Sequence, residues 1–321
     1  MAGTVIARVQ KSLQRRINQL HAYDYPEESA GWHKYEHNPI LGDDQTGSIF
    51  DPFVRKVDQE YVMCLSRRVN HSIMMFYSED GFHWDWESGI EILKGVADSD
   101  WESRVNRACF LRKDNIWHLW YTGQNEGKSK IGYAVSDDGV HYVRKSSHPV
   151  LTPEYSFEGE NVMNPCVLWD TDKACFRMWY AAGENYEPDV ICYAESDDGI
   201  KWSKKAQPIL NSDKNKTYQN NKVGACDVVK SAKSGYIMAY IAYQNINVAR
   251  ICLAHSDDGI SGWKEYQDGP IIAPGRAKWD SHAVYKPTLC VDIENGRTLL
   301  WYNGRTEHRE RIGAAVLDCI I

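Results

Sequence analysis

The sequence predicts an all-β protein, a five-bladed β-propeller with a short N-terminal helix. Three observations predict this fold: an acidic turn that recurs at a fixed spacing, short strands with alternating polarity around each turn, and a proline-and-aliphatic phrase after most turns. A fixed period in a sequence indicates a repeat architecture, in which each repeat is one supersecondary unit. We therefore expect the function to reside in what differs between the repeats.

The acidic turn is the clearest repeat. Its four copies end in Trp or Tyr and lie about 58 to 60 residues apart, beginning at Ser78, Ser136, Ser196 and Ser256. In such a turn, Asp side chains accept bonds from nearby backbone N–H groups and Gly adopts a positive φ. An active site needs one catalytic constellation and not four equivalent ones. We therefore interpret these acids as structural.

Each repeat also carries about four short strands. Aromatic segments such as "IWHLWYTG" and "FRMWYAAG" precede the turns, and phrases such as "HPVL" and "QPIL" follow them. Such strands, bounded by turn residues, are typical of propeller blades. The fifth repeat ends before its acidic turn, whereas residues 31–41 carry the missing tryptophan and Pro-Ile-Leu phrase. We predict that residues 31–321 form one five-bladed domain and that residues 1–30 form a helix and linker.

The segment 4–20 has a helical pattern. Its apolar residues recur at helical spacing, namely Val5, Val9, Leu13, Ile17 and Leu20. Most of its basic residues fall elsewhere on the helical wheel: Arg8, Lys11, Arg15 and Arg16. We expect this helix to pack on the propeller or on a neighbouring subunit, and the second arrangement predicts a homo-oligomer. A membrane-surface helix is less favoured, because the stripe lacks large aromatic residues.

Composition narrows the classes of partner and location. A net charge of −7 without a long basic run argues against nucleic acid or an anionic membrane as the main partner. No apolar stretch approaches the roughly 18 residues of a membrane span, and the first residues lack the apolar core of a signal peptide. The nine cysteines form no Cys-x-x-Cys pair. They suit free thiols in a reducing compartment, so we predict a cytoplasmic protein without metal or cofactor.

The blade starts differ from one another. The innermost strand of a propeller blade begins at the central axis, and the residues just before the strand proline superpose as Asp51, Arg107, Asn164, Ala225 and Lys286. The residues that lie farther out, toward the opening of the central funnel, are Arg104, Glu160, Asn221 and His282. A structural position repeats its chemistry from blade to blade. The asymmetry of these positions therefore predicts a site at the axis.

The repeat resembles a known group. The "Asp-Gly-x-x-Trp" turn, the "MWYAAG" and "LWYTG" strands and the "FDP" opening are similar to the five-bladed propeller glycoside hydrolases of the arabinanase, levansucrase and invertase superfamily, whose fold the mannoside phosphorylases share. The resemblance covers residues 31–321 and implies a base or nucleophile at Asp51. The second acidic position of that group holds Arg107 here, and the position of its acid holds Met163.

Glycosidic cleavage needs an acid on one face of the bond and a carboxylate on the other. The carboxylates nearest to Met163 are Glu160 and Glu158, and we assign Asp51 and Glu160 as the catalytic pair. Glu160 would need a raised pKa to be protonated near neutral pH.

Basic residues near the mouth suggest an anionic ligand, because the guanidinium fork fits carboxylate or phosphate. The predicted substrate-binding residues are Arg67, Arg104, Arg107, Asn164, Asn221, His282, Lys286 and Arg305. The favoured function is a glycoside hydrolase whose substrate is an acidic or phosphorylated sugar. Two alternatives stay open: a phosphate-using phosphorylase or glycosyl transferase, and a propeller that binds a glycan or protein without catalysis.

Overall fold

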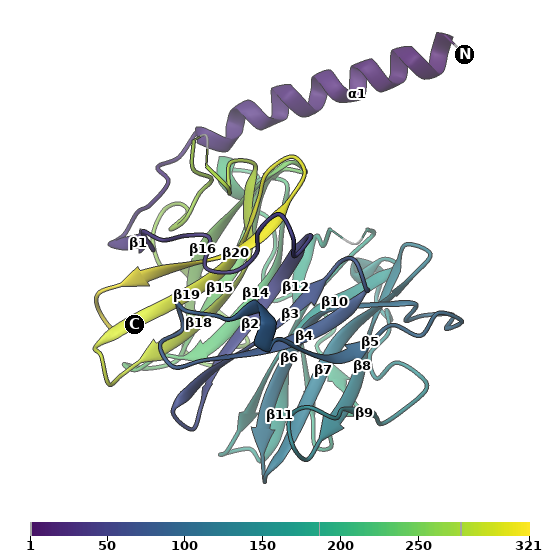
Figure 1. Ribbon diagram of the computed structural model, residues 1–321, viewed down its shortest axis with the longest axis vertical. Helices are drawn as coiled ribbons and strands as arrows, with labels where there is room; N and C mark the ends of the chain where they lie inside the picture. Colours follow the sequence, from purple (N-terminus) through teal and green to yellow (C-terminus); the bar gives the residue numbers. More distant parts are fainter. Residues whose placement is uncertain (1, 186, 277) are drawn as a thin grey trace.

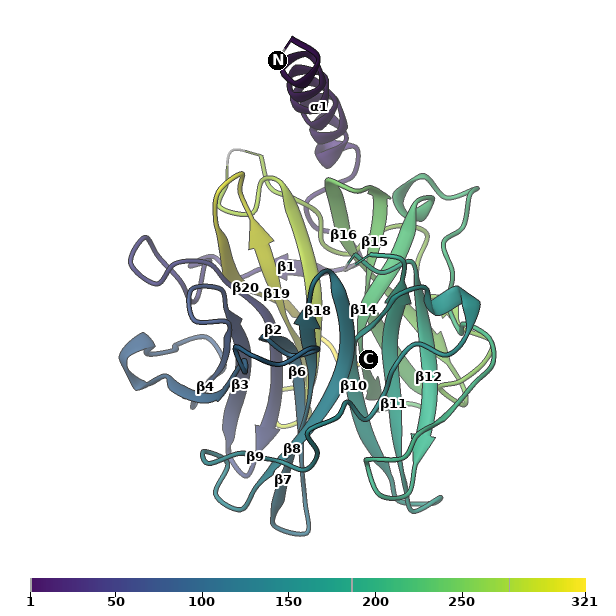
Figure 2. The ribbon, with the colours of Figure 1, turned by 90° about the vertical axis from the view of Figure 1, so that its right-hand side faces the viewer.

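A computed structural model describes residues 2–185, 187–276 and 278–321 of the chain. Within them the protein is all-β apart from helix α1 (Ala2–Leu20) and four short 3-10 helices. The 3-10 helices are η1 (His21–Tyr23), η2 (Trp86–Ser88), η3 (Ser156–Glu158) and η4 (Thr217–Gln219). Figures 1 and 2 show the strands gathered into one body, with α1 extending from it.

Three of the sheets have four strands each. The first contains β2 (Ile49–Val57), β3 (Glu60–Arg67), β4 (Ser72–Ser78) and β5 (Ile90–Lys94). The second contains β14 (Lys222–Lys230), β15 (Tyr236–Asn245), β16 (Val248–Ser256) and β17 (Lys264–Glu265). The third contains β18 (Ala283–Asp292), β19 (Arg297–Arg305), β20 (Glu310–Leu317) and β1 (Trp32–Lys34). Because β1 pairs with β20, the N-terminal segment completes the C-terminal sheet, as predicted.

The remaining sheet has eight strands in two antiparallel halves. One half contains β6 (Arg104–Lys113), β7 (Ile116–Asn125), β8 (Lys128–Ser136) and β9 (Val143–Arg144). The other contains β10 (Asn161–Asp170), β11 (Cys175–Gly183), β12 (Val190–Ser196) and β13 (Ser203–Lys204). One parallel pair, Asn161 with Ser129, joins the halves. Each half therefore has the strand order of a four-stranded sheet.

The strands β2, β6, β10, β14 and β18 share one backbone irregularity. Their register with the following strand shifts at a bulge. A residue other than Gly has a positive φ at each bulge, with values of 57° at Asp51, 52° at Arg107, 55° at Asn164, 41° at Ala225 and 48° at Lys286. We call these five positions the axial bulges. The alignment of the five positions is thus confirmed.

The acidic turns are structural, as predicted. Asp198 Oδ1 accepts bonds from the backbone N–H groups of Ile200 and Lys201, both at 2.8 Å, and Ser196 Oγ accepts one from Gly199. Trp202 Nε1 donates to the Gly199 carbonyl at 3.1 Å, so the aromatic residue packs back over its turn. The other three turns repeat the Asp and Ser bonds.

Tryptophans of the second strands link these turns to neighbouring sheets. Trp120 Nε1 donates to the Gly199 carbonyl at 2.9 Å, and Trp179 Nε1 donates to that of Gly259 at 2.7 Å. Trp301, near the C-terminus, donates in the same way to Gly81, near the N-terminus, at 2.7 Å. A methyl group at Gly81 would lie 2.8 Å from the Trp301 ring, so this turn needs glycine for the close approach as well as for its φ of 80°.

Helix α1 contacts the body only near its C-terminal end in the views of Figures 1 and 2. Gln19 Nε2 donates to the carbonyls of Ser281 and His282, at 3.3 and 3.0 Å. Leu13, Ile17 and Leu20 are exposed. Packing of these residues on the strands is therefore not observed, because the helix extends away from them; packing on a neighbouring subunit stays a prediction. The side chains of Val5, Arg8, Val9 and Lys11 lie outside the described residues.

Two further expectations concern free thiols and membrane-spanning segments. All nine cysteines are free thiols, and eight of them are buried, with Cys319 exposed. Among the residues described, no helix is both long and apolar enough to cross a membrane.

Candidate active site

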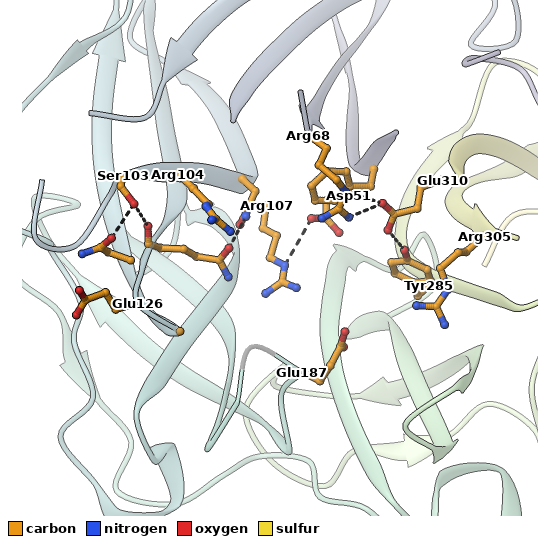
Figure 3. A pocket seen from close by; sticks show the side chains of 15 residues that line it. Asp51, Arg68, Ser103, Arg104, Arg107, Glu126, Glu187, Tyr285, Arg305 and Glu310 are labelled. Carbon is orange, nitrogen blue, oxygen red and sulfur yellow. Dashed lines mark hydrogen bonds and ion pairs between the residues drawn. The ribbon is translucent and has the colours of Figure 1, made fainter. Parts of the chain in front are cut away.

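A cavity of about 480 Å³ lies where the first strands of several sheets begin. Figure 3 shows the side chains that line it. They are Phe50, Asp51, Arg68, Ser103, Arg104, Asn106, Arg107, Gln124, Asn125, Glu126, Gly127, Glu187, Tyr285, Arg305 and Glu310. The cavity is therefore polar, with arginine and carboxylate side chains on facing walls.

Asp51 occupies the axial bulge of β2 and is only 4% exposed. Its backbone N–H donates to Asn303 Oδ1 at 2.8 Å, which fixes the strained backbone. Its Oδ2 accepts no hydrogen bond from a described residue, although Arg107 Nε lies 3.5 Å away. Burial raises the pKa of Asp51 to about 6, against the opposing charges of Arg107 and Lys286. Asp51 can therefore give or take a proton near neutral pH.

Glu310 and Tyr285 form the wall beside Asp51 (Figure 3). The Tyr285 hydroxyl donates a short hydrogen bond to Glu310 Oε1, and Arg68 forms an ion pair with Glu310 Oε2. Glu310 is 9% exposed. Burial and the charge of Glu310 hold the pKa of Tyr285 well above its usual value, so this phenol is neutral at neutral pH.

The opposite wall is the hairpin between β7 and β8. Ser103 Oγ donates to Asn125 Oδ1 at 2.8 Å, and Asn106 Nδ2 donates to Gln124 Oε1 at 2.8 Å. These bonds fix the hairpin against the start of β6 and present amide groups and Glu126 to the cavity. Amides in such positions can bond the hydroxyl groups of a sugar.

Two cavity arginines lack an ionic partner among the described residues. Neither Arg104 nor Arg305 forms an ion pair with a carboxylate of the described residues, whereas Arg68 pairs with Glu310 and Arg107 lies beside Asp51. Arg305 Cζ lies 5.9 Å from the centre of the Tyr285 ring. Their guanidinium groups are therefore available to a carboxylate or phosphate. Within the described part of the chain, no three His, Cys, Asp or Glu side chains are grouped as metal ligands.

The structure brings four of the predicted residues together in the cavity: Asp51, Arg104, Arg107 and Arg305. Glu160 does not line it, which corrects our expectation. Its side chain is 57% exposed and pairs with Lys128 Nζ at 2.6 Å. That contact lowers the pKa of Glu160, whereas a general acid needs a raised pKa. The neighbouring Glu158 is buried and forms an ion pair with Lys204, so it is structural.

The other predicted residues also lie outside the cavity lining. Arg67 stacks over the Trp86 ring at 5.1 Å. Asn221 is exposed, and the His282 carbonyl accepts a hydrogen bond from Gln19 near the C-terminal end of α1. Asn164 and Lys286 are buried at axial bulges, and Lys286 Nζ makes no hydrogen bond to a described residue.

Sequence reasoning missed several cavity residues, among them Gln124, Glu126, Glu187 and Glu310. They lie at the end of the second strand of a sheet, follow that strand, or begin the third strand. An antiparallel second strand ends where the first strand begins, so its hairpin reaches the same mouth. The polar residues that follow each "WYTG"-like strand carry this signal in the sequence.

Comparison with known proteins identifies the family. The family model described as "Glycosyl hydrolases family 32 N-terminal domain" matches residues 96–257, which is half of the chain. A "1,2-beta-oligomannan phosphorylase" of Thermoanaerobacter sp. (strain X514) is 25% identical over 237 residues, covering 71% of this chain and 74% of that protein. A "Beta-1,2-mannobiose phosphorylase" of the same organism is 26% identical over 246 residues, with coverages of 72% and 76%.

An uncharacterized protein of Mycobacterium tuberculosis is 28% identical over 225 residues, covering 67% of this chain and 71% of that protein. Among solved structures, a thermostable family-43 glycoside hydrolase superposes with a TM-score of 0.69 and 17% identity, covering 86% of this chain and 91% of that one. Likeness at this identity shows the fold. The family match goes further: the chain belongs to the family of the glycosyl hydrolase family 32 N-terminal domain, and the protein is a glycoside-processing enzyme.

Proposed function

We propose that the protein hydrolyses a glycosidic bond in the cavity and that its substrate carries an acidic group. The observation that carries this proposal is Asp51, a buried carboxyl group whose Oδ2 is unbonded by the described residues and whose pKa is raised to about 6. A carboxyl group with this pKa suits proton transfer to and from a glycosidic oxygen near neutral pH. Arg104 and Arg305 would bind the anionic group of the sugar.

We further propose that residues 31–321 form a five-bladed propeller, with residues 1–30 as a separate helix and linker. The strands β2, β6, β10, β14 and β18 contact one another in this order, and β18 contacts β2. The bonds from Asp51 to Asn303 and from Trp301 to Gly81 link the two ends of the same cycle. These contacts support one blade for each axial bulge.

Phosphorolysis is the second candidate. The two phosphorylases of Thermoanaerobacter share about a quarter of their aligned residues with this chain, and a phosphate acceptor would suit the unpaired arginines of the cavity. In that reaction phosphate attacks the anomeric carbon, so the enzyme needs an acid but no carboxylate to activate water. Asp51 would then protonate the leaving oxygen only.

Self-association through α1 is also a proposal. Leu13, Ile17 and Leu20 are exposed along a 19-residue helix. Most helical stability in proteins comes from packing of an amphipathic face, so a second subunit would stabilise this helix by covering the apolar stripe. The predicted cytoplasmic location likewise remains a proposal.

The deciding experiment asks whether water or phosphate accepts the glycosyl group. The purified protein is incubated with neutral and acid-terminated oligosaccharides, with and without millimolar phosphate, and products are separated by chromatography. Hydrolysis predicts a free acidic sugar whose release does not need phosphate. A sugar phosphate formed only with phosphate would establish the second candidate. Glycan binding in the cavity without turnover of any glycoside would contradict both and favour a non-catalytic propeller.

A further inference from the structure

We propose that Tyr285, with Glu310 as its base, is the nucleophile of this enzyme, and that the sugar it cleaves carries a carboxylate on the anomeric carbon, as ulosonic acids do. The inference rests on the hydrolysis proposed above and names the covalent step and the substrate class. Tyr285 would take the place of the second carboxylate of the predicted pair, because Glu160 is exposed and lies outside the cavity lining.

The hydrogen bonds hold the phenol ready for proton transfer. Tyr285 lines the cavity, and its hydroxyl donates to Oε1 of the buried Glu310. Arg68 Nε lies 3.2 Å from the other oxygen, Oε2, so the carboxylate is fixed from both sides. Figure 3 shows Asp51 beside this pair, with Arg305 next to Tyr285. Nucleophile, base and acid therefore occupy one end of the cavity.

This arrangement occurs once among the five equivalent strand starts. The residue before the axial bulge is Tyr285 in β18, whereas the other four first strands hold Phe50, Asn106, Met163 and Gly224. Glu310 pairs in register with Arg305, whereas in the sheet of β6 the matching residue, Gln124, pairs with Ser129. Tyrosine–glutamate hydrogen bonds recur elsewhere, as in Tyr121 with Glu102, Tyr180 with Glu158 and Tyr243 with Glu187. Among the described residues, however, Tyr285 is the tyrosine that both precedes an axial bulge and lines the cavity, and this placement points to chemistry.

The negative charge of the proposed substrate explains why the nucleophile would be a neutral phenol and not a carboxylate. A carboxylate nucleophile would approach an anomeric carbon that already carries a negative group, and like charges repel. A neutral phenol avoids this repulsion, and some glycosidases use tyrosine as their nucleophile. Because the pKa of Tyr285 lies well above its usual value, its proton leaves only during the attack, and Glu310 is positioned to accept it. Arg104 and Arg305 are available for the substrate carboxylate.

The reaction balances in two steps. First, Tyr285 Oη bonds to the anomeric carbon as the glycosidic C–O bond breaks; the phenol proton passes to Glu310, and protonated Asp51 gives its proton to the leaving oxygen. Second, water attacks the anomeric carbon as the bond to Tyr285 breaks; Asp51 takes a proton from the water, and Glu310 returns one to the phenolate. The net change is addition of water with retention of configuration.

A covalent trap tests the assignment directly. The protein is incubated with a 2,3-difluorinated ulosonic acid, whose second fluorine slows breakdown of the adduct, and its peptides are mapped by mass spectrometry. We expect the adduct on the peptide that contains Tyr285, and none in Tyr285→Phe. Glu310→Gln keeps an acceptor for the phenol but loses the base, so it should slow adduct formation on the order of 100-fold.

The outcomes separate this inference from the proposed function. An adduct on Asp51, inversion of the first-formed anomer, or Tyr285→Phe turnover within threefold of the parent would overturn the tyrosine assignment and leave hydrolysis in place. Cleavage of neutral glycosides only would overturn the substrate class. A parent protein that forms no adduct and cleaves no glycoside would remove the proposed function and the inference together. Thermal unfolding of each variant shows whether a loss of rate reflects misfolding.

Discussion

The acidic turns and the axial bulges both repeat in the backbone, but only the turns repeat their side chains. Every turn uses a Ser and an Asp to bind backbone N–H groups, whereas the five bulges hold Asp51, Arg107, Asn164, Ala225 and Lys286. The repeated chemistry of the turns builds sheets of one shape. The varied chemistry of the bulges lets two of them, Asp51 and Arg107, contribute side chains to the cavity.

The pKa of an aspartate shifts in opposite directions in the acidic turns and at the axial bulge of Asp51. Asp80 accepts bonds from the backbone and side chain of His83, and these bonds lower its pKa to about 2 although partial burial opposes them. Asp51 is buried with its Oδ2 unbonded by the described residues, and its pKa rises to about 6. Hydrogen bonds stabilise the charged form in the turn, and desolvation disfavours it in the cavity. This difference separates a structural aspartate from a reactive one.

The largest expected effect is on turnover. Asp51→Asn keeps the shape of the side chain but cannot exchange a proton, so turnover of a cleaved glycoside should fall by about 10²- to 10⁴-fold with little change in affinity. Steady-state kinetics give both quantities. Asp198→Asn, in an acidic turn, is the matched control and should leave turnover within a few fold. Near-normal turnover in Asp51→Asn would place proton transfer on another residue.

A smaller effect is expected for the unpaired arginines. Arg104→Ala and Arg305→Ala should each raise KM for an acid-terminated glycoside about 10- to 100-fold, because each removes a charged hydrogen bond of about 1.5 to 3 kcal/mol. KM is compared between the acid and its methyl ester. Arg67→Ala serves as the control, since Arg67 stacks on Trp86 outside the cavity lining. Equal changes for acid and ester would show that these arginines do not bind the carboxylate.

The sequence predicts the repeated parts of this molecule better than its site. Strand positions, turns and the pairing of β1 with β20 follow from periodicity and turn chemistry, which are local. Asp51 was predicted from its place before the strand proline and from the "FDP" resemblance, and its backbone position recurs in every first strand. Glu310 was missed and Glu160 misplaced, because the direction of a side chain beside a hairpin depends on contacts with another sheet or loop. Lys128 draws Glu160 outward, and Arg68 holds Glu310 at the cavity.

Stability should depend on pH in opposite ways in the two regions. The pKa of Asp51 is about 6 in the folded chain and near 3.8 in the unfolded one, so ionising it costs folding free energy as the pH rises from 4 to 7. The unfolding free energy of Asp51→Asn should therefore increase relative to the parent, by on the order of 1 to 3 kcal/mol over that range. Chemical denaturation at each pH measures this difference.

The matched variant Asp198→Asn should change in the other direction. The backbone bonds of Asp198 lower its pKa, so the parent gains stability from this carboxylate above the pKa of the unfolded chain and loses it as the pH falls through the folded value. Relative to the parent, Asp198→Asn should therefore be less stable at pH 7 than at low pH. The same sign of pH dependence in both variants would contradict the distinction between turn and cavity carboxylates.

The smallest expected effect is the removal of one turn carboxylate. Asp198→Ala should lower the free energy of unfolding by about 0.5 to 2 kcal/mol, because the N–H groups of Ile200 and Lys201 lose their acceptor. The adjacent Asp197 is exposed and its side chain makes no hydrogen bond to a described residue, so Asp197→Ala should stay within about 0.5 kcal/mol of the parent. Equilibrium denaturation of both variants gives the comparison. Because the turns build sheets and the bulges build the site, turnover of folded Asp198→Ala should match that of the parent, and its loss would make the turn part of the site.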